Sequence, residues 1–377
     1  MSWRKWVVGL GVLVLLVAFG MPVVAQERME NISAPGTPLP QPRVIKGQPH
    51  VAYVVVDLSS ESCQRDWLQA QLEHKRRGWK LTAVTDANTP DKERNAMQVL
   101  IDKNVDAIVI TYWIMEPLRD LIIQARKKGI GVYCVDTELK PGVLVDTTQP
   151  NGVVGATMAY YIIDHLEGRG NVAVLNYQGH ILRQRCYAAR ALFESKIDWP
   201  ALSMVAWQDL SVPGYEKHSY DITASWLLKY GKKLNAIFAG WDIPGVFAAK
   251  AALAGGYTRK DLIITGIDGG SLAYDMIRSG SPFTATMSQP FEEYVYNTYE
   301  VVKNMQVDGK GIGEKGCMVP NHRNVYSVPV LTTPENLPPI GTNIHEVFKA
   351  TYYDTSKKDA WYMYGDAYKI THELVTK

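Results

Sequence analysis

Acidic residues follow several apolar runs of this sequence, at positions where their carboxylates could bind a polar ligand. The acids at these positions are Asp57, Asp136, Asp242 and Asp268. Asp268 has the clearest pattern, because it follows the β-branched run 263–267 and precedes Gly269 and Gly270. Ionised carboxylates accept stronger hydrogen bonds than neutral groups do, and glycine lets a ligand approach the backbone closely. The pattern indicates a polar binding cleft.

Strand and helix patterns alternate along the chain and would place these acids at one edge of a sheet. Short apolar runs bounded by glycine are typical of parallel strands that are buried on both faces. Apolar residues at helical spacing follow the runs, as Trp67, Leu68 and Leu72 follow the run 51–56. This alternation predicts a parallel sheet with helices on both faces, and ligands bind outside the carboxyl ends of such strands.

The alternation occurs twice, first from about residue 50 to 148 and again from about 149 to 289, and it predicts two similar lobes. A chain of 377 residues is also too long for one small core. Residues 26–49 are rich in proline, lack periodicity and are expected to form a linker or a loosely packed arm. Residues 338–377 are rich in tyrosine, fit neither repeat, and are expected to form a C-terminal appendage.

The first residues have the features of a secretory signal peptide. Arg4 and Lys5 precede an apolar run that extends to about Val24, and we expect cleavage after Ala25. The competing interpretation is a retained membrane anchor, because the run approaches spanning length. Removal of residues 1–25 leaves 38 basic and 38 acidic residues. The mature chain therefore lacks the basic excess typical of nucleic-acid-binding proteins.

The sequence contains no pattern that predicts catalysis, a cofactor or a metal. The cysteines Cys63, Cys134, Cys186 and Cys317 allow three full pairings, and we expect them to be free or structural. Their spacings and those of the eight histidines do not suit a metal. Nucleophile-elbow, phosphate-loop and zinc-protease motifs are also missing.

Six short segments at strand ends and helix starts follow one another along the chain: Asp57–Ser60, Val132–Asp136, Asn151–Gly155, Phe238–Asp242, Gly266–Gly269 and Thr284–Pro290. In this order they resemble the type I periplasmic binding proteins, the ribose- and galactose-binding group that delivers sugars to ABC importers. The resemblance covers roughly residues 50–335. The resemblance implies two similar doubly wound parallel-sheet lobes joined by a three-stranded hinge, with the ligand between them.

Transferred to this chain, the three crossovers of the hinge fall near Thr148-Gln149, near Gln289-Pro290 and at about 321–324. The N-terminal lobe would then comprise residues 50–148 and 290–322. The C-terminal lobe would comprise residues 149–289 and 323–337. Closure of the two lobes about the hinge is the motion expected for this arrangement.

The resemblance also implies ligand-binding roles for residues from both lobes. Asp136 and Asp268 match the family's sugar-binding acids, and helix capping is the alternative role for each. The family places an arginine that donates two hydrogen bonds to the sugar near Arg183 and Arg185, and Arg185 matches better. Asn151 and Gln289 match amides at the crossovers. The full set of candidate ligand-binding residues is Asp57, Ser60, Trp113, Asp136, Asn151, Arg185, Trp241, Asp242, Asp268 and Gln289.

Aromatic residues are distributed differently from the ribose-type pattern. That pattern has aromatic residues in the first loop, where this chain has Ser62 and Cys63, and an amide where it has Trp241. Indole rings stack on the apolar faces of sugars, so we expect Trp241 and Trp113 to supply the aromatic wall, with Tyr112 as a further candidate. Core packing is the alternative for both tryptophans. This rearrangement leaves the identity of the sugar open.

These observations predict a periplasmic or extracellular solute-binding protein that binds a sugar or sugar-like polyol between two lobes. Its expected partner is a membrane ABC permease. The alternative is a periplasmic sensor of the same fold that signals to a membrane histidine kinase or chemoreceptor. An enzyme on a doubly wound fold would need more assumptions, since binding alone accounts for the acids.

Overall fold

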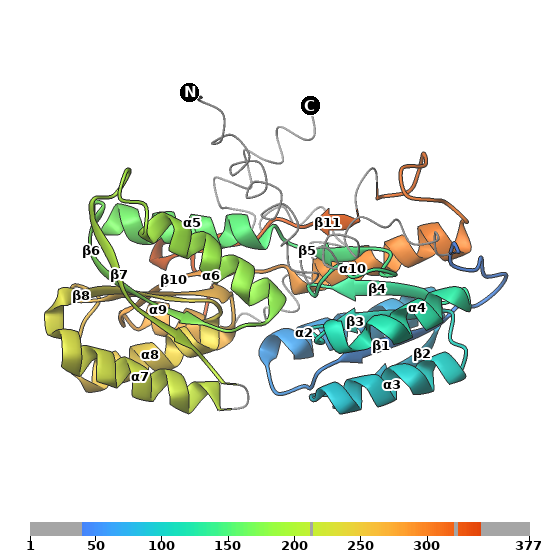
Figure 1. Cartoon of the computed structure of the whole chain (residues 1–377), viewed down its shortest axis with the longest axis horizontal. Helices are drawn as coiled ribbons and strands as arrows, with labels where there is room; N and C mark the ends of the chain where they lie inside the picture. Colours follow the sequence, from blue (N-terminus) through green and yellow to red (C-terminus); the bar gives the residue numbers. More distant parts are fainter. Residues whose placement is uncertain (1–39, 212–213, 320–322, 341–377) are drawn as a thin grey trace, which may run out of the picture. The chain divides into compact units, whose positions relative to one another are not determined.

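The computed structural model describes residues 40–211, 214–319 and 323–340 (Figure 1). Within these ranges the chain forms two six-stranded sheets with helices on both faces, one sheet in each of two lobes. Each sheet has the strand order of a doubly wound fold, in which the first strand lies between the second and the third. The described part of the chain therefore consists of two α/β lobes, as the alternation of patterns predicted.

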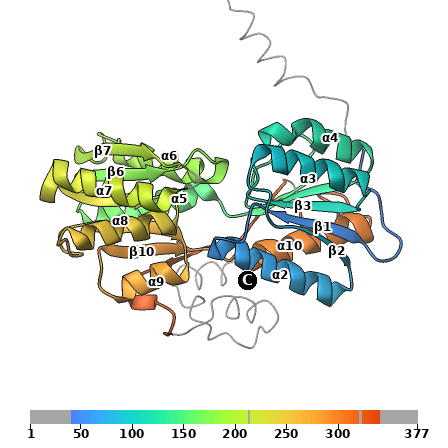
Figure 2. The same ribbon diagram turned by 90° about the horizontal axis from the view of Figure 1, so that it is seen from below.

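The first sheet has the order β11-β5-β4-β3-β1-β2, and all of its strand pairs are parallel. Its strands are β1 His50–Val55, β2 Lys80–Val84, β3 Ala107–Thr111, β4 Gly131–Val135, β5 Asp146–Thr148 and β11 Asn324–Tyr326. The helices of this lobe are α2 Glu61–Arg77, α3 Pro90–Asp102, α4 Arg119–Lys127 and α10 Phe291–Val302. In Figure 2, α2 and α10 cover one face of the sheet, and α3 and α4 cover the other.

The second sheet has the order β12-β10-β9-β8-β6-β7, and β12 is antiparallel to β10. Its strands are β6 Arg169–Asn176, β7 Ala201–Asp209, β8 Leu234–Ala239, β9 Ile263–Asp268, β10 Phe283–Ser288 and β12 Val330–Thr332. The helices of this lobe are α5 Asn151–His165, α6 His180–Phe193, α7 Tyr215–Tyr230, α8 Asp242–Ala254 and α9 Ser271–Arg278. The other strand pairs of this sheet are parallel.

Each sheet is buried on both faces because its strands carry apolar side chains in alternating directions. In β1, Val51 and Tyr53 belong to the core beneath α2 and α10, while Ala52 and Val54 belong to the core beneath α3 and α4. The second sheet divides in the same way, with α7, α8 and α9 over one core and α5 and α6 over the other. This accounts for the unbroken apolar runs of the sequence.

The third crossover lies later in the chain than the sequence predicted. Residues 323–337 were assigned to the second lobe, but Asn324–Tyr326 pairs with Asp146–Thr148 as an edge strand of the first sheet. The chain then crosses between Tyr326 and Val330, where β12 joins the second sheet. The short strand β11 has no composition that marks it for one lobe, so its position depends on pairing alone.

The end of the predicted linker is part of the first lobe. The backbone amide of Arg43 donates to the carbonyl of Gly129 at 2.8 Å, and its guanidinium pairs with Asp106 at 2.9 Å. The predicted signal peptide and nearly all of the C-terminal appendage lie outside the described residues. Within the described ranges, no helix is long and apolar enough to cross a membrane. All four cysteines are free.

Candidate functional site

Asp136 and Asp268 occupy corresponding positions at the carboxyl edges of the two sheets. Asp136 follows β4 and Asp268 ends β9, each the fourth strand of its lobe in chain order. Their backbone φ angles are 40° and 151°, values that non-glycine residues seldom adopt. Backbone strain of this kind is concentrated at ligand-binding and catalytic sites. The two acids are therefore held at the edge where a doubly wound fold binds ligands.

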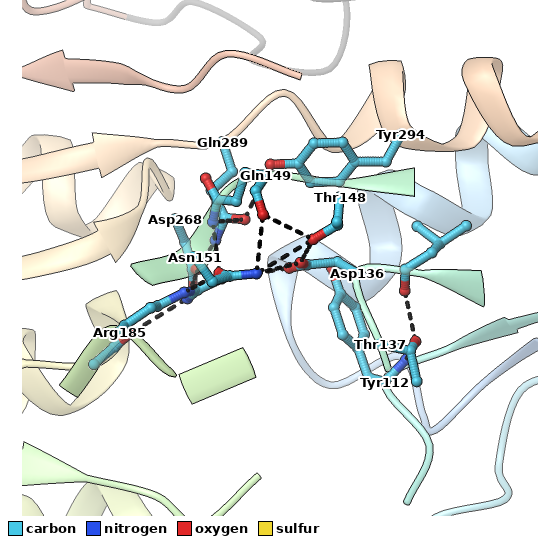
Figure 3. Close-up of polar contacts among 12 residues, drawn as sticks. Tyr112, Asp136, Thr137, Thr148, Gln149, Asn151, Arg185, Asp268, Gln289 and Tyr294 are labelled. Atoms are coloured by element: carbon cyan, nitrogen blue, oxygen red, sulfur yellow. Dashed lines mark hydrogen bonds and ion pairs between the residues drawn. The ribbon is translucent and has the colours of Figure 1, made fainter. Parts of the chain in front are cut away.

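Arg185, on α6 of the second lobe, joins the two acids. Its side chain is 1% exposed, and its Nη2 lies 3.3 Å from Oδ2 of Asp136 in the first lobe. Its Nη1 lies 3.6 Å from Oδ1 of Asp268 and donates to the carbonyl of Gly240 at 3.2 Å. Its Nε donates to Oδ1 of Asn151 at 2.6 Å. Figure 3 shows this guanidinium at one end of the polar network, beside Asn151 and Asp268.

Close packing of α5 against α6 positions Arg185. A Cβ atom at Gly155 of α5 would lie 2.1 Å from the backbone oxygen of Arg185, so only glycine fits there. Gly155 belongs to the Asn151–Gly155 segment that the sequence singled out. The same helix thus supplies Asn151 as a hydrogen-bond partner of Arg185 and Gly155 as the contact that lets α6 approach.

Amides from two crossovers complete the network. Gln289 donates from Nε2 to Oδ1 of Asp268 at 2.5 Å, and Gln149 donates from Nε2 to Oε1 of Gln289 at 2.6 Å. Asn151 donates to Oδ1 of Asp136 at 3.1 Å, and the Thr148 hydroxyl donates to the same oxygen at 2.5 Å. These contacts connect the hinge strands directly to the acids that bind a ligand in our hypothesis (Figure 3).

The electrostatics of the network suit a neutral ligand with many hydroxyls. Burial raises the pKa of Asp268 well above its usual range, the nearby charge of Asp242 raises it further, and Arg185 opposes both effects. Asp136 is fully buried, and its carboxylate is paired with Arg185, Asn151 and Thr148. The Asp136 carboxylate and the Arg185 guanidinium thus provide a charged acceptor and a charged donor, which form stronger hydrogen bonds with hydroxyls than neutral groups do.

Three other predicted residues lie outside this network and hold local structure. Asp242 is buried and accepts from the Thr286 hydroxyl at 2.6 Å and from the Gly270 amide at 2.9 Å. It thereby fixes the turn that follows Asp268, and burial raises its pKa to about 6. Ser60 caps the start of α2. Asp57 accepts from the amide and hydroxyl of Ser59 in its own loop.

The two predicted tryptophans have different surroundings. Trp241 follows β8 and makes edge contacts with Tyr177 and Tyr215, with ring centroids 6.1 Å and 5.5 Å away. Burial raises the pKa of Tyr215 to about 12, and the charges of Glu216 and of Asp57 in the first lobe raise it further. Trp113 is 3% exposed and packs within the core beneath α3 and α4, which favours the core-packing alternative for this residue.

Sequence reasoning missed Gln149 and Thr148 as members of the site. The sequence marked Thr148-Gln149 as a crossover, but a crossover alone does not indicate which side chains point inward. A pocket of about 300 Å³ lies next to these residues and is also lined by Thr137, Asp146 and Tyr326. Within the described residues, no group of three or more His, Cys, Asp or Glu side chains is arranged to hold a metal ion.

Comparisons with known proteins agree with the two-lobed α/β fold. A family model described as a periplasmic binding protein domain matches residues 51–311. A xylitol-binding protein of Mycolicibacterium smegmatis is 26% identical over 204 residues, which are 52% of this chain and 56% of the relative. The chain thus matches little more than half the length of that relative.

Solved structures of similar fold cover more of the chain. An ABC transporter solute-binding protein from Agrobacterium vitis with bound allitol has a TM-score of 0.68 and 22% identity, and the match covers 77% of this chain and 97% of that one. A 5-methylthioribose transporter solute-binding protein from Thermotoga lettingae has a TM-score of 0.69 and 21% identity, over 82% and 94% of the two chains. At these identities the likeness shows the fold alone.

Proposed function

We propose a function for this chain from the premise that it belongs to the periplasmic binding protein family, whose model covers residues 51–311. This family consists of solute-binding proteins and not of enzymes. We infer that the chain binds a sugar or sugar-like polyol between its two lobes and delivers it to a membrane ABC importer. In this proposal the chain is exported, with residues 1–25 as its signal peptide.

The network around Arg185 is the observation that carries the proposal. It joins Asp136 of the first lobe to Asn151, Asp268 and Gln289 of the second lobe and its crossovers, all at hydrogen-bond or ion-pair distance. A polyol between the lobes would replace these contacts by hydrogen bonds from its own hydroxyls. Trp241, with Tyr177 and Tyr215, would cover an apolar face of the ligand.

The ligands named for similar proteins support a sugar or polyol as the ligand of this chain. The relatives described above bind xylitol, allitol or 5-methylthioribose according to their descriptions, and all three compounds carry several adjacent hydroxyls. The two solved relatives are solute-binding proteins of transporters. This favours transport over sensing, and no feature of the described residues favours the sensor alternative.

Titration calorimetry of the purified mature chain tests the proposal. The panel should contain xylitol, D-ribose, D-allose and myo-inositol, together with glycine betaine and a dipeptide as solutes without the polyol pattern. We expect at least one polyol or sugar to bind with a Kd in the micromolar range or below, without chemical conversion. Binding should be lost in Asp268→Ala, because the groups that donate hydrogen bonds to this acid would be left unpaired in a buried cleft. Failure of every sugar and polyol to bind would refute the proposal.

A further inference from the structure

A pocket of about 300 Å³ lies beside the first crossover between the lobes. Thr137 and Asp146 of the first lobe line it, and so do Ile181 and Gln184 on α6 of the second lobe. This volume is at the lower end of the range that is typical of small-molecule sites. We call this space the crossover pocket.

The crossover pocket is distinct from the charged part of the polar network. Asp136, Arg185 and Asp268, the charged residues of that network, do not line the pocket. Thr148 and Asn151 belong to both, but each of these side chains already donates a hydrogen bond to Asp136. A ligand in the crossover pocket would therefore bind mainly through other groups than a polyol between the lobes.

Asp146 is the only residue with a charged side chain among the described residues that line the crossover pocket. It is 4% exposed, and its side chain accepts one hydrogen bond from a described residue, the Thr137 amide at 3.3 Å from Oδ1. No lysine, arginine or histidine in the described ranges forms an ion pair with it. A buried carboxylate without a cation is costly, and its second oxygen, Oδ2, is left for a ligand.

The surroundings of Asp146 favour a positive charge. Burial raises the pKa of Asp146 well above its usual range, the charges of Asp136 and Glu138 raise it further, and the Thr137 amide opposes these effects. Gln149, which also lines the pocket, has a buried amide oxygen without a partner among the described residues. Both groups lack a donor, and an ammonium group supplies three donors, a positive charge and no acceptor.

Apolar side chains form the rest of the pocket wall. Leu139, Pro150, Val153 and the ring of Tyr326 are among them. Val153 is 62% exposed and Tyr326 is 50% exposed, so these two lie at the open side of the pocket. An aliphatic chain can pack against them, and the face of a tyrosine ring attracts cations.

We propose that the crossover pocket binds a small aliphatic primary amine. Its ammonium group donates hydrogen bonds to Oδ2 of Asp146, and its carbon chain packs against Val153 and Tyr326. This site does not rest on the proposed function, because it takes a different class of ligand through different groups. The chain would then bind two solutes, a polyol between the lobes and an amine beside the first crossover.

Titration calorimetry of the purified mature chain with n-butylamine tests the proposal. Phosphate buffer is required, because amine buffers would compete for the site. We expect n-butylamine to bind at one site with a submillimolar Kd, and n-butanol, which has the same number of non-hydrogen atoms but no charge, to bind at least tenfold more weakly. Where a polyol is found that binds the chain, n-butylamine should still bind to the chain saturated with it.

Three variants locate the amine. Asp146→Asn keeps an oxygen for the Thr137 amide and removes the charge, so it should weaken n-butylamine at least tenfold. Glu138→Gln is the matched control, because Glu138 is a neighbouring acid that pairs with Lys140 at 3.0 Å and does not line the pocket. It should change the Kd less than twofold. Tyr326→Ala changes a half-exposed ring that the fold does not need, and it should weaken binding at least threefold. Circular dichroism and thermal unfolding confirm that each variant is folded.

Several results would overturn the amine site and leave the proposed function standing. They are the failure of n-butylamine to bind the folded wild type, equally tight binding of n-butanol, and equal losses in Asp146→Asn and Glu138→Gln. Displacement of n-butylamine by a polyol would show that the pocket is part of the polyol site. Tighter binding of Nα-acetyllysine amide than of n-butylamine would assign the pocket to a lysine side chain of another protein and overturn the free amine.

Discussion

The guanidinium of Arg185 in the second lobe lies 3.3 Å from the carboxylate of Asp136 in the first. Both side chains are 1% exposed, so this ion pair between the lobes is shielded from water. Removing one member of a buried pair leaves an uncompensated charge and costs more than the pair contributes. A ligand that enters between the lobes must therefore supply partners for both groups.

Replacement of Arg185 by lysine should weaken ligand binding on the order of 100-fold. Lysine keeps the charge but cannot reach Asp136, Asn151 and the Gly240 carbonyl at once, because it lacks the planar fork of arginine. Calorimetry with the tightest-binding polyol measures the loss. Arg183→Lys, two residues earlier on the same helix, is the control and should change Kd less than threefold. Equal losses in both variants would refute the central role of Arg185.

Two glycines of α5 should respond in opposite directions to replacement by alanine. A Cβ at Gly155 would meet the Arg185 backbone oxygen at 2.1 Å, whereas a Cβ at Gly152 has nothing within 4 Å. Gly155→Ala should therefore lower the free energy of unfolding by about 1–3 kcal/mol and weaken polyol binding by displacing α6. Gly152→Ala should raise the free energy of unfolding by up to about 1 kcal/mol, because alanine favours the helix. Urea unfolding measures both, and similar values for the two variants would contradict the packing argument.

The strand ends of the site were predictable because short apolar runs leave few alternatives. A run that is buried on both faces must end where the sheet ends, so Asp136 and Asp268 could be assigned to the carboxyl edges from the sequence. Family resemblance then favoured Arg185 over Arg183, and the structure buries Arg185 in the network. None of this required knowledge of tertiary contacts.

The inner face of α2 could not be predicted in the same way. The sequence pattern indicated Trp67, Leu68 and Leu72 as its apolar positions, but Leu68 is 46% exposed. The buried residues of α2 include Asp66 and Arg65, and Arg65 forms a buried ion pair with Glu292 of α10 at 2.8 Å. A polar inner face has no periodic apolar signal, so it becomes visible only when its partners are placed.

Glu93, in the first lobe, should make stability depend on pH. Burial raises its pKa to about 7 from an ordinary value of 4.5, and its side chain keeps one oxygen without a partner among the described residues. A carboxyl whose pKa is higher in the folded chain than in the unfolded chain stabilises the fold while it is protonated. This contribution is lost as the pH rises from about 4.5 through about 7.

Glu93→Gln should therefore raise the free energy of unfolding at pH 8 and leave it nearly unchanged at pH 5. We expect a gain on the order of 2 kcal/mol at the higher pH, since glutamine keeps an oxygen for the Ile114 amide that Glu93 now binds at 3.3 Å. Urea unfolding at both pH values measures the difference. Glu314→Gln, which changes an exposed glutamate, is the control. A pH-independent effect of Glu93→Gln would show that its ionisation does not matter.

Glu61 should slow the release of ligand, because it bridges the lobes at their surface. Its carboxylate, on α2 of the first lobe, accepts from the amide of Ser271 at 2.8 Å and from the Ser271 hydroxyl at 2.9 Å. Ser271 begins α9 of the second lobe, where the helix dipole favours a negative charge. The contact can form only when the two lobes approach, so it should stabilise the closed, ligand-bound state.

Glu61→Gln should accordingly raise the dissociation rate of a bound polyol about fivefold and leave its association rate nearly unchanged. Glutamine keeps the length of the side chain but loses the charge and one of the two acceptor oxygens, and an exposed contact of this kind contributes about 1 kcal/mol. Stopped-flow tryptophan fluorescence measures both rates. Ser271→Ala removes the hydroxyl and retains the amide, so it should have a smaller effect, and the double variant should release ligand no faster than Glu61→Gln. Additive effects of the two substitutions, or a change confined to association, would show that Glu61 does not act through Ser271.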